Sequence, residues 1–224
     1  MEHSFRAQDG GPALIRLLAY VGGAAASPPS QALAPQLAQW IEWRQAVALS
    51  SALEAQPSAC DSDVPTGTDG DEDCAQVRAS LVRSIDGDRA FTTTSADAAF
   101  FRQRCHLLQQ WMGAEVGLLR KRLRERLARR STAFARLAAA DAAMEQALAP
   151  RERASLAAVP EILGRHFERL RDAQPASGDT AAPWLDAFRR DMRALLVAEL
   201  DLRLQPTRGL SAALRTDTAG PHAE

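Results

Sequence analysis

The segment "FFRQRCHLLQQWMGAEVGLLRKRLRERLARR" spans residues 100–130 and contains no proline. Its apolar side chains recur every three or four residues, which places them on one face of an α-helix. This near-heptad spacing is typical of helices that pack along their length. The pattern predicts one long helix over 96–130, capped by Ser95, at the centre of the fold. Its expected core face is Phe101, Cys105, Leu108, Met112, Val116, Leu119, Leu123 and Leu127.

The rest of the chain repeats this helical spacing and shows no strand-like alternation. Alanine, leucine, arginine and glutamate, which are strong helix formers, dominate the composition. The sequence therefore predicts an all-α fold, a bundle of six to seven helices with two or three long core helices. We expect residues 1–224 to form a single helical domain. The other expected helices cover about 11–21, 30–55, 73–86, 131–148, 150–172 with a break at Pro160, and 184–205 with an end at Pro206, followed by a short turn.

Three segments are expected to lie outside these helices. Residues 56–73 hold six acids, no base, two prolines and two glycines, which predicts a flexible acidic loop. Residues 173–182 form a polar linker that contains proline and glycine. Residues 215–224 are expected to be a disordered tail.

The overall charge does not indicate a dedicated nucleic-acid binder. The formal net charge is −1, and 26 of the 27 basic residues are arginine, Lys121 being the exception. Nucleic-acid-binding domains usually carry a basic excess over a whole face. A GC-rich genome explains the preference for arginine, although arginine also forms bidentate contacts with carboxylates and phosphates.

Cysteine usage and the N-terminus predict a cytoplasmic protein. Three cysteines without a CxxC pair fit a reducing compartment better than a disulfide framework. A signal peptide is not expected, because Glu2 and Asp9 lie in the leader and Arg16 interrupts the apolar core. No stretch of 18 uncharged apolar residues is present, so no transmembrane segment is predicted.

Motifs of known catalytic or metal chemistry are missing, so neither an enzyme nor a cofactor is expected. The sequence has no GxSxG, P-loop, GxGxxG, HExxH or CxxC pattern. The acids of 61–72 resemble a calcium loop, but Pro65 and Thr66 occupy positions that need an oxygen ligand and a glycine. Cys105 and His106 are adjacent and would point about 100° apart on a helix, so they cannot pair as nucleophile and base.

Two carboxylates interrupt the apolar faces of their expected helices. Asp141 and Glu199 would both point toward the core, where a carboxylate must be paired or hydrogen-bonded. Pairing with arginine is the simpler interpretation, and both residues are expected to be structural. A di-metal site of the bundle type would also need Glu-x-x-His partners, which the sequence lacks.

The segment "LLRKRLRERLARR" (118–130) is the strongest candidate for a binding surface. It holds seven basic residues and one acid. Arg120, Lys121 and Arg124 should lie opposite the leucine face, where they would meet solvent, an acidic partner, phosphate or an anionic membrane surface. The acidic loop of the same chain is an internal alternative. A second candidate partner surface is Trp40 and Trp43, which share a helix side, although tryptophans in this spacing are more often part of a core.

Several segments together resemble a known family. They include "LAQWIEWRQAVALSSAL" (37–53), "RLAAADAAMEQALAPRERASLAAVPEILGRHFERL" (136–170) and "LLVAELDLRLQPTRGLSAALR" (195–215). They are similar to an uncharacterised proteobacterial family, domain of unknown function 3348. The family has no known activity and transfers no catalytic residue. The resemblance implies that the gene for this protein lies beside genes for membrane proteins that have a peptidoglycan-binding OmpA/MotB-like domain.

The sequence thus predicts a non-enzymatic cytoplasmic helical protein that binds other proteins. Under the family resemblance, it would be an accessory subunit of an envelope-associated assembly, whose partner is a membrane protein with an OmpA/MotB-like domain. The alternative is a nucleic-acid-associated protein that uses the basic helix 118–130. The sequence does not determine the oligomeric state or the pathway.

Overall fold

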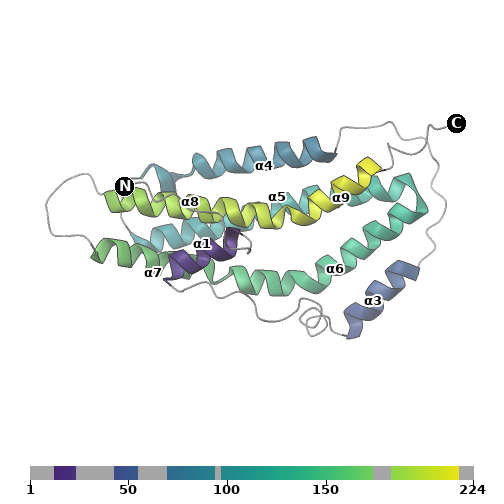
Figure 1. Ribbon diagram of the computed structural model, residues 1–224, viewed down its shortest axis with the longest axis horizontal. Coiled ribbons are helices and arrows are strands. Elements are labelled where there is room, and N and C mark those ends of the chain that lie inside the picture. Colours follow the sequence, from purple (N-terminus) through teal and green to yellow (C-terminus); the bar gives the residue numbers. More distant parts are fainter. Residues whose placement is uncertain (1–12, 24–42, 55–69, 94–96, 174–182, 217–224) are drawn as a thin grey trace.

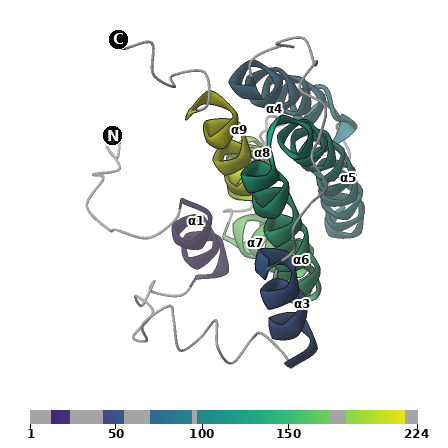
Figure 2. The same cartoon turned by 90° about the vertical axis from the view of Figure 1, so that its right-hand side faces the viewer.

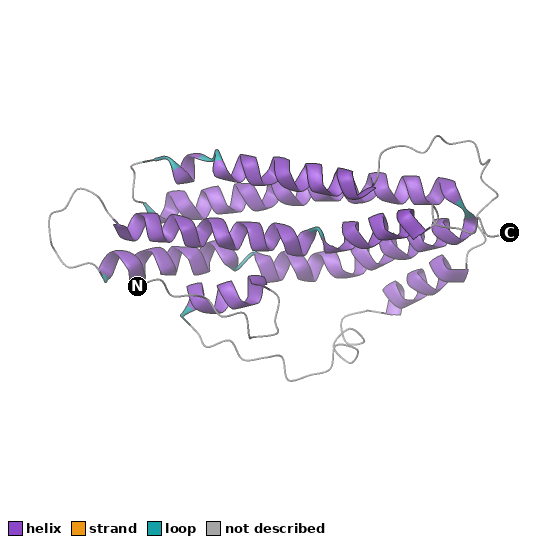
Figure 3. Cartoon of the chain, turned by 45° about the horizontal axis from the view of Figure 1, so that its top comes forward, coloured by secondary structure: helices purple, strands orange, loops and turns teal. Residues whose placement is uncertain are grey.

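A computed structural model describes residues 13–23, 43–54, 70–93, 97–173 and 183–216. Within these ranges every regular element is a helix and no strand occurs, as Figure 3 shows. The long helices run side by side as roughly straight lines along the longest axis of the molecule (Figure 1). The predicted all-α bundle with long core helices is therefore confirmed.

The central element is α5 (Ala98–Arg130), a helix of 33 residues and about 50 Å. All eight residues of its predicted core face are buried. The N-cap is Asp97, whose carboxylate accepts a 2.9 Å hydrogen bond from the Ala99 backbone N–H. The helix thus begins at Ala98, two residues later than expected, and the expected cap Ser95 lies outside the described residues.

The chain returns through α6 (Thr132–Leu156) and α7 (Val159–Asp172). The predicted helix boundary at Pro150 is wrong, because α6 continues through this residue. Pro150 is exposed, so its missing N–H faces water and not a dry core. Pro160 lies in the first turn of α7, where a helix needs no N–H donor, so the break predicted there is confirmed.

The last line of the bundle is α8 (Pro183–Arg203) followed directly by α9 (Gln205–Thr216). Pro206 ends α8 as predicted, but it also lies in the first turn of a 12-residue helix where only a short turn was expected. Since α9 continues to Thr216, the first two residues of the expected tail 215–224 are helical. The linker 173–182 lies outside the described residues, apart from Ala173 at the end of α7.

Helix α4 (Gly70–Asp86) runs antiparallel to α8 and α9 and is followed by the short helix η1 (Arg89–Phe91). Because α4 begins at Gly70, residues 70–73 of the expected acidic loop 56–73 are helical. Its first turn holds Asp71, Glu72 and Asp73, and acidic side chains stabilise a helix N-terminus. The rest of that loop lies outside the described residues.

Three ion pairs set the register between α4 and the α8–α9 line. Asp86 pairs with Arg193 at 2.5 Å and Arg78 pairs with Asp201 at 2.8 Å. Asp71 pairs with Arg215 at the far end. On α4 the partners are seven and eight residues apart, about two helical turns, whereas on the α8–α9 line they are eight and fourteen residues apart, because the longer interval contains the break between the two helices. We call these three pairs the α4 ladder.

The shorter helices α1 and α3 lie beside the long helices (Figure 2). Helix α1 (Ala13–Gly22) packs against α7 and α8, and α3 (Trp43–Glu54) packs against α6. Of the helix expected over 30–55, only the α3 part falls within the described residues. Leu14 and Val21 of α1 are buried.

An aromatic cluster closes one end of the core between α5, α7 and α8. The ring centroids of Phe101 and Phe188 lie 4.9 Å apart, and those of Phe167 and Phe188 lie 5.2 Å apart. Trp184 adds an edge contact to Phe167 at 5.0 Å. All three phenylalanines are fully buried, so this cluster contributes the largest apolar side chains of the core.

The buried face of α6 differs from the one that residue spacing alone indicates. Leu137, placed on that face by its spacing, is 41% exposed, whereas Ala138 and Ala147 are buried. Alanine is the smaller side chain and allows α6 to approach α5 closely. The carboxylate of Asp141 lies on the side toward α5, because Arg120 of α5 pairs with it there.

Candidate functional site

The basic end of α5 is held mainly by carboxylates of neighbouring helices. The Arg120 guanidinium forms a bidentate pair with Asp141 at 2.8 and 2.7 Å. Arg124 donates to Glu145 at 2.6 Å and to Asp141 at 3.3 Å. The side chains of Arg120 and Arg124 are only 14% and 17% exposed. We call Arg120, Arg124, Asp141 and Glu145 the α5–α6 ion cluster.

This cluster corrects the expectation that Arg120, Lys121 and Arg124 share one open face. Only Lys121 is well exposed, at 70%, with Glu125 at 3.9 Å. The other two cations face α6, because Asp141 and Glu145 occupy positions one turn apart on that helix. Burial by itself lowers the pKa of Arg120, but the hydrogen bond to Asp141 and the charges of Asp141, Glu145 and Glu152 raise it overall. The acidic surface that covers Arg120 and Arg124 is therefore inside the chain.

Two further arginines of the basic segment also reach neighbouring helices. Arg126 donates to Asp73 of α4 at 2.5 Å, and Arg130 donates to the Leu214 carbonyl of α9 at 2.6 Å. Asp73 was assigned to the acidic loop but lies in the first turn of α4, so one acid of that predicted loop does contact the basic helix. Four of the basic side chains of 118–130 thus hold α5 to α4, α6 and α9.

The second candidate surface cannot be placed. Trp40 lies outside the described residues. Trp43 is the first residue of α3, and its side chain also lies outside what the structure describes. Both remain predictions.

The side chains of Glu199 and Asp141 are buried to different degrees. Glu199 of α8 is 0% exposed, with one oxygen bound by Arg203 at 2.9 and 2.8 Å. Its other oxygen accepts from Gln109 of α5 at 2.8 Å, and Gln109 also donates to the Leu156 carbonyl at 3.2 Å. Asp141 is half-buried, at 14% side-chain exposure. Both carboxylates are paired with arginine, and they belong to separate clusters.

The histidines and cysteines of the described residues do not assemble a reactive site. No group of three metal-ligating side chains lies together in these ranges. Cys105 is fully buried, and desolvation together with the charge of Glu199 raises the pKa of its thiol. His106 is exposed and contacts Gln110 at 2.9 Å, so the two neighbours diverge as expected. Of the calcium-like stretch 61–72, residues 70–72 lie in α4 and Asp71 binds Ser211 and Arg215.

One buried polar contact was missed by sequence reasoning. His166 of α7, placed on the apolar face by its spacing, is 5% exposed, and its Nε2 lies 2.8 Å from the Asp191 carboxylate of α8. Its Nδ1 lies 3.2 Å from the Arg169 guanidinium, which also donates to the Val21 carbonyl of α1. Asp191 carries no spacing signal that links it to α7, so only the packing of α7 on α8 shows the contact.

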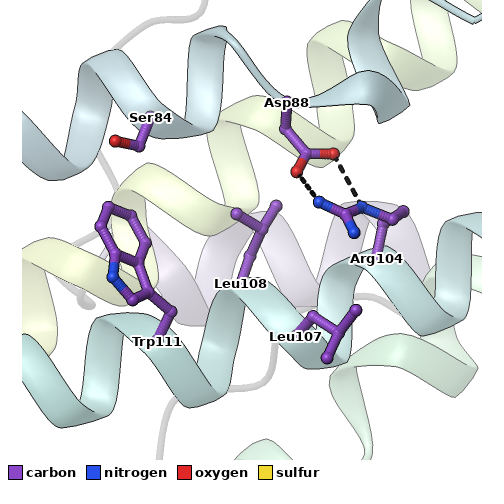
Figure 4. A pocket seen from close by; sticks show the side chains of 6 residues that line it. All are labelled: Ser84, Asp88, Arg104, Leu107, Leu108 and Trp111. Atoms are coloured by element: carbon purple, nitrogen blue, oxygen red, sulfur yellow. Dashed lines mark hydrogen bonds and ion pairs between the residues drawn. The ribbon is translucent and has the colours of Figure 1, made fainter.

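A shallow hollow opens between α4 and α5. It is lined by Ser84 and Asp88 on one side and by Arg104, Leu107, Leu108 and Trp111 on the other, as Figure 4 shows. Asp88 accepts a bidentate contact from Arg104 at one end, one of its distances being 3.1 Å. Asp88 also caps η1 by accepting from the Ala90 N–H at 2.9 Å. Asp88 and Arg104 are thus already hydrogen-bonded within the protein, and the rest of the hollow is lined mainly by the apolar side chains of α5.

The outward side of α5 carries a line of side chains that are exposed, apart from the half-buried Trp111. Leu107 and Leu118 are 41% and 55% exposed, and the half-buried Trp111 lies between them. Toward the C-terminus the line continues with exposed cations. At 100° per residue these positions fall within an arc of about 100°. We call this line the outer stripe of α5; it comprises Leu107, Trp111, Ala114, Leu118, Lys121, Arg122, Glu125 and Arg129.

Fold and surface together define a helical bundle with an exposed apolar-to-basic stripe on its central helix. The chain belongs to the family described as "Protein of unknown function (DUF3348)", whose profile matches residues 1–216. No curated protein and no solved structure matches the chain significantly. In the described residues, no helix combines the length and the apolar character that crossing a membrane requires.

Proposed function

We propose that this protein is a non-enzymatic cytoplasmic accessory subunit that binds another protein through the outer stripe of α5. The observation that carries the proposal is the exposure of Leu107 and Leu118 beside Trp111 on the helix that forms the centre of the bundle. A contiguous apolar surface rimmed by charge is a common feature of protein-binding sites. Tryptophan and arginine are also enriched among residues that dominate binding energy.

The rigidity of α5 supports a binding role. Its inner face is buried along the whole length, and Arg120, Arg124 and Arg126 fasten its C-terminal half to α4 and α6. A helix held on both flanks presents its outward side chains in a fixed geometry. Binding then requires little ordering of the backbone, which reduces the entropic cost of association.

The identity of the assembly is part of the proposal. The family resemblance implies a partner among membrane proteins with an OmpA/MotB-like domain, which would place the chain in an envelope-associated assembly. A cytoplasmic subunit would reach such a partner through the partner's own cytoplasmic segment.

Affinity capture with matched variants tests this function. The full chain and its Leu107→Ser/Leu118→Ser variant are used to capture proteins from a native lysate at low and high salt. The control variant is Leu137→Ser/Leu53→Ser, because Leu137 and Leu53 are also 41% and 55% exposed. The proposal expects the first variant to lose a specific partner that the control retains. Equal recovery by both variants, or no specific partner at all, would contradict it.

Nucleic-acid binding is the second candidate, favoured by the exposure of Lys121, Arg122 and Arg129. A phosphate-dependent interaction should appear as a shift of DNA or RNA in a gel at about 50 mM salt and weaken steeply as salt rises. The shift should disappear in the Lys121→Glu/Arg122→Glu/Arg129→Glu variant. Absence of a shift in the wild-type chain would remove this candidate.

A further inference from the structure

The outer stripe of α5 changes character along its length. Leu107, Trp111 and Leu118 form the N-terminal part, and Lys121, Arg122 and Arg129 form the C-terminal part. From residue 107 to residue 129 the stripe extends about 33 Å along the helix axis. Glu125 is the one acid within the stripe, at 3.9 Å from Lys121. The stripe is therefore apolar at one end and positive at the other.

The flanks of the stripe are occupied by neighbouring helices. On one side, Arg120 and Arg124 turn to the carboxylates of α6. On the other side, Arg126 turns to Asp73 of α4. Arg122 and Arg129 are exposed between these flanks and take part in none of the ion pairs described among residues 70–93, 97–173 and 183–216. Their charge remains available to an external carboxylate.

The hollow beside Trp111 marks where an apolar side chain would enter. Leu107, Leu108 and Trp111 supply its apolar wall, and the α4 residue Ser84 forms the opposite rim (Figure 4). Its volume of about 300 Å³ is at the lower limit for small-molecule sites. Because the Asp88–Arg104 pair closes its polar end, the hollow suits a side chain of a larger partner.

We infer that the outer stripe docks an amphipathic helix of a partner protein that is apolar at one end and acidic at the other. This inference rests on the proposed function and adds the chemistry and orientation of the partner. Apolar residues at helical spacing contact Leu118 and enter the hollow beside Trp111, which is the helix-in-groove mode of recognition. Carboxylates at the other end pair with Arg122 and Arg129. The opposite orientation would leave these two arginines against apolar residues, so charge selects one direction.

Site-specific photo-crosslinking in the native cell tests this orientation. The photoreactive residue p-benzoylphenylalanine replaces Leu118 in the full chain, and mass spectrometry identifies the attached peptide. The same residue at the equally exposed Leu53 of α3 is the control. We expect a crosslinked peptide from position 118 that has leucine-like residues at helical spacing and an acidic cluster beside them, on either the N-terminal or the C-terminal side. Thermal unfolding by circular dichroism checks that each variant folds.

Charge reversal separates the inference from the proposed function. In an Arg122→Glu/Arg129→Glu background the crosslink from position 118 should fall about tenfold, and high salt should weaken it likewise. Crosslinking to a neutral or basic peptide, to nucleic acid or to a second copy of this chain would overturn the inference. So would a crosslink that charge reversal leaves unchanged. If the capture experiment finds a stripe-dependent partner while position 118 gives no crosslink, the proposed function stands and this inference fails.

Discussion

Glu199 shows how a single residue links three helices of the bundle. Its carboxylate lies without solvent contact between Gln109 of α5 and Arg203 of α8, and Gln109 also binds the end of α6. A buried carboxylate is stable only while its hydrogen-bonding partners remain in place. The sequence indicated an arginine partner for this residue, but Gln109 carried no signal beyond its place one residue after Leu108.

Replacing Glu199 by alanine should destabilise the protein strongly. The change leaves the amide of Gln109 and the guanidinium of Arg203, whose side chain is only 13% exposed, without their carboxylate. Breaking a buried pair in this way costs about 3–5 kcal/mol. The free energy of unfolding, measured by urea titration, should fall by that amount.

Glu152 is the matched control for this change. Its carboxylate also contacts Arg203, at 3.3 Å, but it is 44% exposed. Exposed pairs contribute about 0–1 kcal/mol, so Glu152→Ala should have a small effect. A similar loss of stability for Glu152→Ala and Glu199→Ala would show that burial does not set the strength of these contacts.

At the scale of elements, α6 is held to α5 by charge as well as by apolar contact. Its buried residues include Ala138, Ala147 and Leu156, and the α5–α6 ion cluster lies between them. Small side chains bury little area, so the ion cluster should contribute measurably to the specificity of this packing. The physical role of Arg120 and Arg124 is thus to place α6 on α5.

A double-mutant cycle on Arg120 and Asp141 measures this contribution. Arg120→Ala, Asp141→Ala and the double variant should give a coupling free energy of about 1–3 kcal/mol in urea unfolding, because both side chains are 14% exposed. The corresponding cycle on Lys121 and Glu125, which are 70% and 49% exposed, should give no more than about 0.5 kcal/mol. A larger coupling in the exposed pair would contradict the assignment of Arg120 to structure.

The α4 ladder should make stability depend on pH at the acidic end. The hydrogen bond from Arg78 lowers the pKa of Asp201, and that from Arg193 lowers the pKa of Asp86. A carboxylate whose pKa is lower in the folded state stabilises the fold above its unfolded pKa of about 4. This stabilisation is lost as the pH falls through the lower folded value.

Asp201→Asn should therefore reduce the loss of unfolding free energy that the protein shows as the pH becomes acidic. Between about pH 4 and pH 2 the free energy of unfolding of the wild type should fall more steeply than that of the variant. The difference at neutral pH should be about 1 kcal/mol or less, since the Asp201 side chain is 35% exposed. An equally steep fall of the unfolding free energy in the two proteins would show that the Arg78–Asp201 pair does not contribute to the pH dependence.

At the scale of the whole molecule, the core is continuous from α1 to α9. Apart from Ala147, the buried apolar residues of the described ranges form one cluster, and the aromatic group around Phe188 joins α5, α7 and α8 at one end of it. A single continuous core favours cooperative unfolding. Damage at one end should therefore destabilise helices that lie at the other end.

Phe188→Ala should lower the free energy of unfolding by about 3–5 kcal/mol, because it removes a fully buried aromatic ring. Unfolding followed by circular dichroism and by tryptophan fluorescence should remain coincident, with both midpoints shifted together. Leu118→Ala on the outer stripe, where the side chain is 55% exposed, should change stability by about 0.5 kcal/mol or less. Separate midpoints for the two probes in Phe188→Ala would contradict a single core.

Periodicity in the sequence was sufficient for the inner face of α5, but not for that of α6. The residues predicted for the core face of α5 are all buried, because a spacing of three and four leaves one possible face for a helix in water. Proline was a weaker guide. Pro160 and Pro206 each lie in the first turn of a helix, whereas the exposed Pro150 lies within α6.

The sequence by itself determined that the chain is helical and which side of α5 is buried, because these follow from local spacing and side-chain polarity. It did not determine which cations stay free. Arg120, Lys121 and Arg124 lie within five positions of the sequence. Only the position of α6 shows that Arg120 and Arg124 are paired with Asp141 and Glu145. The outer stripe of α5 exists because α4 and α6 cover the two flanks of the helix and leave the side between them exposed. Such a surface depends on contacts between residues far apart in the chain, so only the tertiary structure decided it.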